Sequence, residues 1–160
     1  MSSPLSKKEA KERAGRFCSF RERSPQEVLE KLHSWGIAEA DSHDLVAELI
    51  EMNFINEQRF ANAYCNDKFE FNSWGKQKIR SGIFPHRISE KAILSALDRI
   101  DPTKYEARLF DLASKKWNRL EGEEESKRKQ KTVNFLAGKG YELDLIWNVI
   151  SSLATGKSRT

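Results

Sequence analysis

The sequence is poor in cysteine and in long hydrophobic runs. Its two cysteines, Cys18 and Cys65, lack CxxC spacing, which argues against a disulfide scaffold and a zinc site. Their apolar neighbours favour small core residues. No stretch approaches the roughly 20 apolar residues that a membrane helix needs, and residues 1–8 lack the apolar run of a signal peptide. We therefore expect a cytoplasmic protein without membrane contact.

The motifs of common enzymes are missing too. The sequence has no GxxxxGK[ST] loop, no GxGxxG turn after a strand and no GxSxG elbow. Its histidines (His33, His43 and His86) do not pair with a second His, Cys or carboxylate at a metal-ligand spacing such as HExxH. We expect no catalysis, no metal and no cofactor, and we interpret all three histidines as surface or boundary residues.

Charge is unevenly distributed. Residues 24–56 carry seven acidic residues and one basic residue, whereas residues 1–23 carry seven basic and three acidic residues. An acidic segment between basic ones predicts a surface with two electrostatic faces and argues against a uniformly basic nucleic-acid binder. Lys7, Lys8, Lys11, Arg13 and Arg16 could form a mobile basic arm.

Helical signals are frequent, and no window alternates like a strand. Ser24, Pro25 and Glu27 form a capping box with proline at the first helical position. Asp101-Pro102 is a similar start, and Asn56 and Ser89 are weaker ones. The expected helices span 5–21, 25–35, 42–52, 57–70, 74–84, 89–100, 102–120, 125–138 and 142–154. Gly82 and Pro85 predict that the fifth helix ends early or kinks.

These helices fall into three groups of three. The second helix of each group ends in an apolar residue, a turn residue four positions later, and another apolar residue: Leu32/Gly36/Ile37, Ile83/Arg87/Ile88 and Leu136/Gly140/Tyr141. Each group is near the lower size limit for independent stability, so stacking would bury the faces that single groups expose. The prediction is an all-α fold of three tandem three-helix repeats in an elongated, curved array. Its parts are a basic N-terminal arm (1–23) running into the first helix, repeats at 5–56, 57–101 and 102–154, and a disordered tail at 155–160.

One segment combines basic and aromatic residues: Lys68, Phe69, Phe71, Trp74, Lys76, Lys78 and Arg80. Lys76 and Arg80 are four residues apart and share a helix face, with Ile79 directed to the core. We expect the aromatic residues to anchor the turn between two helices. A basic ridge that faces phosphates or an acidic protein, and a merely solvated helix face, are equally compatible with the spacing.

Three segments stand out as motifs: Ser24-Pro25-x-Glu27-x-Leu29 followed by Leu32 and Gly36, the run Asn53-Phe54-Ile55-Asn56-Glu57-Gln58-Arg59-Phe60-Ala61, and Trp74-Gly75-Lys76-x-Lys78-Ile79 followed by Arg87-Ile88-Ser89. Together they resemble the RecX family. The second run departs from the family pattern at Asn56, where Asp is common, and at Gln58. Asparagine caps a helix as well as aspartate does. The resemblance covers roughly residues 10–153 and is weakest in the third repeat.

The resemblance implies a regulator that binds the recombinase RecA or its filament on single-stranded DNA and limits filament extension, ATPase and strand exchange. It implies a monomer, with some contact to DNA, acting in recombination, DNA repair and the SOS response. The candidate contact residues are Arg59, Lys68, Lys76, Lys78, Arg80 and Arg87; for Arg59, pairing with a neighbouring acid is the alternative. A stand-alone DNA-binding module and an adaptor for another protein remain open alternatives.

Overall fold

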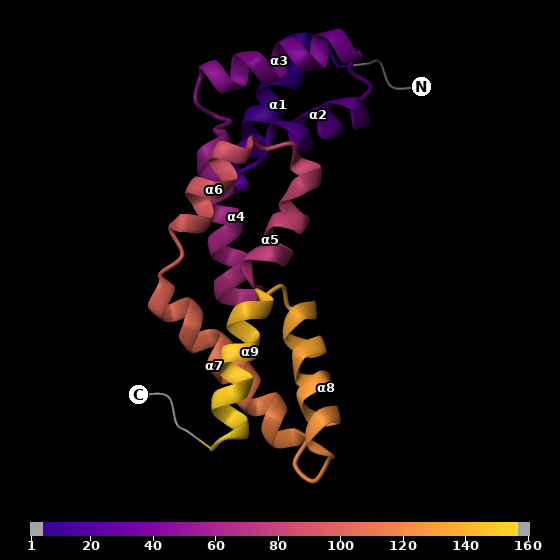
Figure 1. Cartoon of the computed structure of the whole chain (residues 1–160). Helices are drawn as coiled ribbons and strands as arrows, with labels where there is room; N and C mark the ends of the chain where they lie inside the picture. The colour runs from indigo at the N-terminus through magenta and orange to yellow at the C-terminus, as the bar shows by residue number, and fades with distance from the viewer. Residues whose placement is uncertain (1–4, 157–160) are drawn as a thin grey trace. The chain divides into compact units, whose positions relative to one another are not determined.

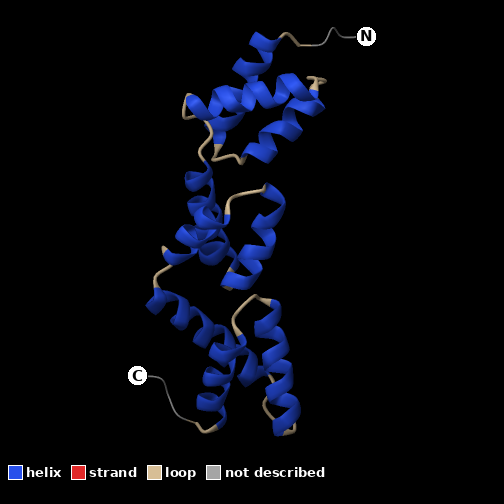
Figure 2. Ribbon diagram, turned by 45° about the horizontal axis from the view of Figure 1, so that its top comes forward, coloured by secondary structure: helices blue, strands red, loops and turns tan. Residues whose placement is uncertain are grey.

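A computed structural model describes residues 5–156, and all regular secondary structure in that range is helical (Figures 1 and 2). The helices are α1 (Lys7–Phe20), α2 (Pro25–Ser34), α3 (Glu39–Glu51), α4 (Glu57–Asn72), α5 (Lys76–Ile83), α6 (Glu90–Asp98), α7 (Pro102–Arg119), α8 (Glu125–Gly138) and α9 (Leu143–Ala154). A 3₁₀ turn, Phe84–His86, follows α5. The predicted all-α repeat class is confirmed. The curvature of the array stays a prediction.

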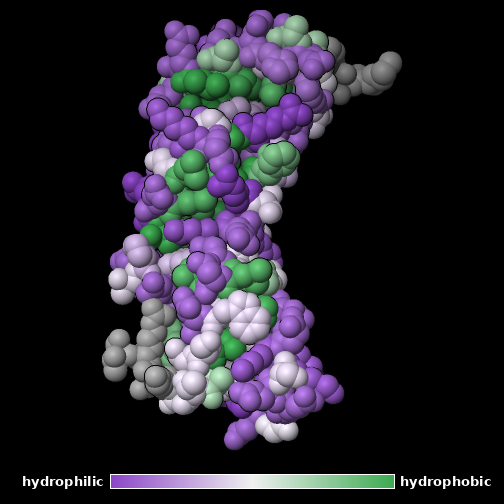
Figure 3. Space-filling view, viewed as in Figure 1, coloured by the Kyte–Doolittle hydropathy of each residue, from purple (hydrophilic) through white to green (hydrophobic). Residues whose placement is uncertain are grey.

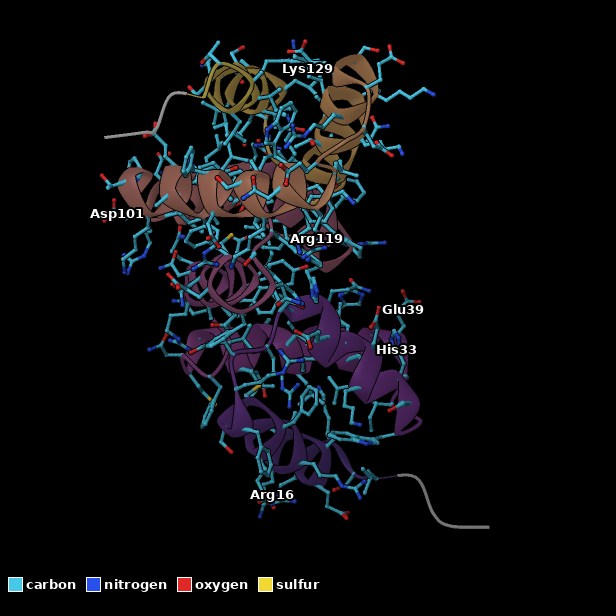
Figure 4. All side chains as sticks on the ribbon, turned by 90° about the horizontal axis from the view of Figure 1, so that it is seen from below. Arg16, His33, Glu39, Asp101, Arg119 and Lys129 are labelled. Carbon is cyan, nitrogen blue, oxygen red and sulfur yellow. The ribbon has the colours of Figure 1, made fainter. Side chains whose placement is uncertain are left out.

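Local capping explains most helix starts. The Glu27 amide donates to Ser24 Oγ at 3.1 Å and the Ser24 amide donates to Glu27 Oε1 at 3.1 Å, which is the predicted capping box. Asp101 accepts a hydrogen bond from the Thr103 amide at the start of α7, whose two ends are marked by Asp101 and Arg119 in Figure 4. The expected start of α3 at residue 42 was wrong. The helix begins at Glu39, behind Ala38, which offers no side-chain cap that a sequence pattern could reveal.

The turn that ends each second helix has the same backbone conformation in all three repeats. Gly36, Arg87 and Gly140 have φ angles of 82°, 58° and 97°. After Gly36 and Gly140 the chain closes a Schellman-type bond, from the Ile37 amide to Leu32 O (3.1 Å) and from the Tyr141 amide to Leu136 O (3.2 Å). The predicted turn positions are confirmed, and Arg87 holds a left-handed conformation that glycine adopts in the other two repeats.

The chain divides into two compact units. The first takes residues up to Tyr64 together with Ile83–Ala96, and the second takes Cys65–Gly82 with the residues from Leu97 onward. In the first unit α1, α2 and α3 pack around a core of Ala10, Ala14, Val28, Leu32, Ile37, Leu45, Val46, Leu49 and Ile55. In the second unit α7, α8 and α9 pack against one another around Leu109, Leu136, Ile146 and Ile150.

The N-terminal basic residues are not a mobile arm from Lys7 onward. They lie on α1, which buries Ala10 and Ala14 against the first core. Lys7 pairs with Asp41 (3.8 Å) and Asp44 (3.5 Å), and Lys11 pairs with Glu48 (3.3 Å). The opposite charges of residues 1–23 and 24–56 therefore neutralise each other in part, which reduces the predicted electrostatic contrast. Residues 1–4 of the predicted arm and 157–160 of the predicted tail lie outside the described residues.

Two breaks in helical pattern have the predicted effect. α5 ends at Ile83, and Pro85 sits in the 3₁₀ turn that follows it.

Cys65 is buried as expected, and burial raises the pKa of its thiol to about 11. Cys18 is only half-buried and packs against the first core from its margin. Hydrophilic residues cover most of the face in Figure 3, with apolar patches between them.

Candidate partner-binding surface

A left-handed turn at the end of α4 places Trp74. Ser73 has a φ of 56°, its amide donates to Phe69 O (3.0 Å), and the Trp74 amide donates to Lys68 O (3.1 Å). The Lys68 Nζ then lies 4.9 Å from the Trp74 ring centroid, and the Lys78 Nζ of α5 lies 4.8 Å from it. The indole is thus flanked by two ammonium groups within cation–π distance. We call Lys68, Trp74 and Lys78 the tryptophan–lysine cluster.

The start of α5 is capped by the third repeat rather than by its own sequence. The Gly75 amide donates to Lys139 O (2.7 Å) and the Gln77 amide donates to Gly140 O (3.0 Å). The Lys76 amide donates to the Tyr105 hydroxyl (2.9 Å). Because three amides of the first turn already have acceptors, this helix start has little capacity left to bind a phosphate.

Tyr105 holds the Lys76 side chain as well as its amide. The Lys76 Nζ lies 5.1 Å from the Tyr105 ring, and the Tyr105 hydroxyl donates to Glu142. Burial, and next the hydrogen bond to Glu142, raise the pKa of Tyr105 although the Lys76 amide opposes them. The phenol therefore keeps its proton and serves as donor and acceptor at once. Because both the amide and the ammonium group of Lys76 contact Tyr105, Lys76 is half-buried against α7.

Arg108 of α7 binds the end of α4. Its NH1 group donates to Phe69 O (2.7 Å) and Ser73 Oγ (3.0 Å), and its NH2 group pairs with Glu70 (3.4 Å). The guanidinium carbon also lies 4.6 Å from the Phe69 ring centroid. These contacts fix the turn that carries Trp74.

The predicted role of the aromatic residues holds for Phe69 and fails for Phe71. Phe69 is buried and packs against Tyr105, with ring centroids 5.8 Å apart. Phe71 is 82% exposed, because it lies two residues further along α4 and points to another side of the helix. Arg80 is exposed on α5, and Ile79 is fully buried as predicted.

Arg59 lies in the first unit and is occupied by its own chain. Its Nε donates to Glu22 (2.9 Å), NH1 donates to Asn53 Oδ1 (2.9 Å) and NH2 donates to Asn53 O (3.0 Å). Asn53 has a φ of 65°, in the left-handed region that asparagine tolerates better than most residues, and Arg59 holds this turn between α3 and α4. The structure thus realises the alternative that this arginine pairs with a neighbouring acid.

Arg87, also in the first unit, is exposed and follows His86 in the turn after α5. His86 is less ordinary than the sequence indicated. Its Nδ1 lies 2.9 Å from Ser24 Oγ and 3.8 Å from Glu27 Oε1, and its ring packs on Phe60 at 4.7 Å. His86 therefore joins the turn of the second repeat to the capped start of α2.

Glu27 at this junction is held in its charged form. Burial acts to raise the pKa of Glu27, but the hydrogen bond from the Ser24 amide and the hydrogen bond and charge of Arg21 bring it below the ordinary value. The Arg21 NH2 group lies 2.6 Å from Glu27 Oε2.

Four of the six candidate residues gather in the second unit on α4 and α5, and two lie in the first unit. The sequence did not indicate that Lys68 and Lys78 meet over the Trp74 ring. It also did not indicate that Gly75, Tyr105 and Arg108 hold this cluster in place. The Trp74-Gly75 dipeptide was the available signal for these two residues. The contribution of α7 comes from residues about 30 positions away and left no local signal.

Two further observations concern residues 5–156. No helix in this range is both long and apolar enough to cross a membrane. No group of three or more His, Cys, Asp or Glu side chains in the same range is arranged to hold a metal ion.

The geometry defines an all-α helical-repeat protein with an aromatic and basic surface segment. Two family profiles match it: "RecX, second three-helix domain" at residues 56–97 and "RecX, third three-helix domain" at residues 104–150. The Regulatory protein RecX of Chlorobium phaeobacteroides (strain BS1) is 31% identical over 135 residues, which cover 84% of this chain and 87% of the relative. The chain therefore belongs to the RecX family.

Other relatives agree with this assignment. The Regulatory protein RecX of Clostridium perfringens (strain 13 / Type A) is 30% identical over 137 residues, covering 84% of this chain. The matched part spans 64% of that relative, so the chain represents less than two thirds of its length. The crystal structure of RecX from Lactobacillus salivarius has the same fold, with a TM-score of 0.84 at 23% identity over 93% of this chain and 97% of that one. The names of the relatives describe a regulatory protein, not an enzyme.

Proposed function

We propose that this chain binds RecA, or the filament that RecA forms on single-stranded DNA, and limits filament extension, ATPase activity and strand exchange. Family membership carries the proposal, because the relatives are regulatory proteins named RecX. The protein would act in the cytoplasm as a monomer that occupies its partner without catalysing a reaction.

The tryptophan–lysine cluster supports a contact role for the second repeat. Trp74 is half-buried, so part of its ring is available to a partner, and the flanking ammonium groups add positive charge. Tryptophan is enriched among the residues that dominate binding at protein interfaces, and lysines add charge complementarity to an acidic partner. We propose Lys68, Lys78 and Arg80 as the main contacts, with Lys76 and Arg87 beside them, and assign Arg59 to positioning.

An ATPase assay tests the proposal. RecA, single-stranded DNA and ATP are mixed with increasing amounts of this protein, and ATP hydrolysis is followed. We expect hydrolysis to fall as the protein approaches stoichiometric amounts. Unchanged hydrolysis together with no binding to the filament would rule the proposal out.

Direct binding to single-stranded DNA is a second candidate function, and Trp74 is the observation that favours it. A base could stack on the accessible part of the half-buried Trp74 ring while Lys68 and Lys78 neutralise the adjacent phosphates. Such binding needs no RecA and weakens steeply as salt rises. A filter-binding titration with a labelled oligonucleotide at several salt concentrations separates the two functions.

A further inference from the structure

The first unit contains an open groove of about 620 Å³ between α1 and the end of α3. Its walls include Met52 and Phe54, which are 51% and 42% exposed, and the floor is closed by buried Leu49. Large apolar side chains exposed together at a concave site are typical of a binding surface.

The apolar wall of the groove is built rigidly. The Phe54 amide donates to Leu49 O (2.9 Å) behind the left-handed Asn53, which fixes the turn that ends α3. Arg59 adds hydrogen bonds to both the side chain and the carbonyl of Asn53. The apolar residues therefore stay exposed in a fixed arrangement rather than collapsing on α1.

The other wall of the groove carries positive charge. Lys8, Lys11 and Arg16 of α1 line it, with Glu12 as the acidic residue among them. Lys11 forms an ion pair with Glu48, whereas Lys8 and Arg16 form no ion pair with any residue between 5 and 156. Arg16 of α1 is labelled in Figure 4. The groove thus combines an apolar surface with three cations and one carboxylate, Glu12, on its other wall.

Gly15 keeps this groove open. It lies inside α1, where glycine weakens a helix relative to alanine. Nothing in the fold requires it, because a Cβ at this position would meet only Phe54 Cε1, at 4.0 Å. The absence of a side chain is instead useful to an occupant, since any large residue at position 15 would fill the space beside Phe54.

We propose that this groove binds an acidic amphipathic helix of a partner protein, with apolar side chains on Met52 and Phe54 and carboxylates facing Lys8 and Arg16. The charge complementarity selects this occupant over a neutral or basic segment. The inference does not depend on RecA being the partner, and it assigns a binding role to the first repeat, separate from the tryptophan–lysine cluster.

The test uses a fluorescent helical peptide of about 16 residues, with leucine on one face and glutamate on the other. Its control replaces each glutamate with glutamine. We expect the full chain to bind the acidic peptide with a Kd on the order of 10 µM and the glutamine peptide at least about tenfold more weakly. Failure to bind the acidic peptide, or equal binding of both peptides, would overturn the proposal.

Variants locate the binding to the groove. Gly15→Trp should weaken binding of the acidic peptide at least about tenfold, whereas Gly15→Ala should bind like the unmodified chain. Lys8→Glu with Arg16→Glu provides a second test that leaves the shape of α1 unchanged. Unaltered binding in both Gly15→Trp and the charge-reversed variant would place the peptide elsewhere and overturn the proposal.

A second copy of this chain is the competing occupant. Sedimentation velocity of the unmodified chain and of Gly15→Trp distinguishes it. We expect both proteins to have the same sedimentation coefficient, because a groove that binds another protein does not hold two copies of this chain together. A dimer that dissociates on Gly15→Trp would show that the groove serves self-association, and would overturn the proposed partner.

Discussion

The backbones of Gly75 and Gly140 touch across the junction of the second and third repeats. A Cβ on Gly75 would lie 2.3 Å from the carbonyl carbon of Gly140, and a Cβ on Gly140 would lie 2.3 Å from Lys78 Cβ. Two hydrogen bonds, from Gly75 to Lys139 and from Gln77 to Gly140, cross the same contact. The glycine of the Trp74-Gly75 motif is thus a packing requirement, and it determines where the adjacent cluster is held.

Gly75→Ala should destabilise the second unit. The added methyl group meets backbone, which cannot rotate away as a side chain can, so the two hydrogen bonds must lengthen or break. We expect a loss of about 2–3 kcal/mol in the free energy of unfolding, measured by urea denaturation. Gly138→Ala is the matched control, because a Cβ there meets nothing within 4 Å. Equal stability of the two variants would contradict the close backbone contact between Gly75 and Gly140.

Arg87→Gly should make the protein more stable. Arg87 has a φ of 58° at a position where the other repeats have glycine, and an L side chain is strained in that region. We expect a gain of about 1 kcal/mol in the free energy of unfolding. Gly36→Arg, which creates the same strain in the first repeat, should lose a similar amount. If Arg87→Gly is neutral or destabilising, the side chain makes a stabilising contact that outweighs the strain.

The capped start of α2 should make stability fall in acid. The pKa of Glu27 is below its ordinary value of 4.5 in the folded chain, so its contribution is present above pH 4.5 and is lost as the pH falls through the lower, folded-state value. Unfolding by urea at neutral and acid pH measures this. Glu27→Gln should show a smaller fall than the unmodified chain. An equal fall in the free energy of unfolding for the two proteins would show that ionised Glu27 does not stabilise the fold.

Lys68→Ala combined with Lys78→Ala should weaken the complex with the RecA filament. Both ammonium groups flank Trp74, so their removal takes away charge at the centre of the proposed contact. We expect roughly a fivefold or larger rise in Kd, measured by co-sedimentation with filaments. The control removes the same charge from two exposed residues elsewhere, Lys91→Ala with Lys104→Ala. A similar loss in the control would indicate non-specific electrostatic attraction.

The helices could be predicted from the sequence where their signals are local. Ser24 and Asp101 start helices through contacts within three residues, so the pattern alone reveals them. Ala38 precedes α3 without a side-chain cap, so no local signal in the sequence marks where this helix begins. Phe71 was misplaced because aromatic residues near a turn do not show which side of the helix each one occupies.

The candidate site was predictable in content and not in arrangement. Lys68 and Lys78 were among the expected residues, but their meeting over Trp74 depends on the left-handed Ser73 and on Arg108 from α7. Likewise the link from Ser24 to His86 spans 62 positions, and neither residue carries a local sign of the other. Such contacts are created by stacking of repeats, which a helix pattern does not encode.

The most direct measurement of the central claim is the length of RecA filaments on single-stranded DNA, seen by electron microscopy with and without this protein. We expect shorter filaments as the protein is added during assembly, and less shortening with the Lys68→Ala/Lys78→Ala variant. Filaments of unchanged length at equimolar protein, with none of it bound to them, would contradict the account.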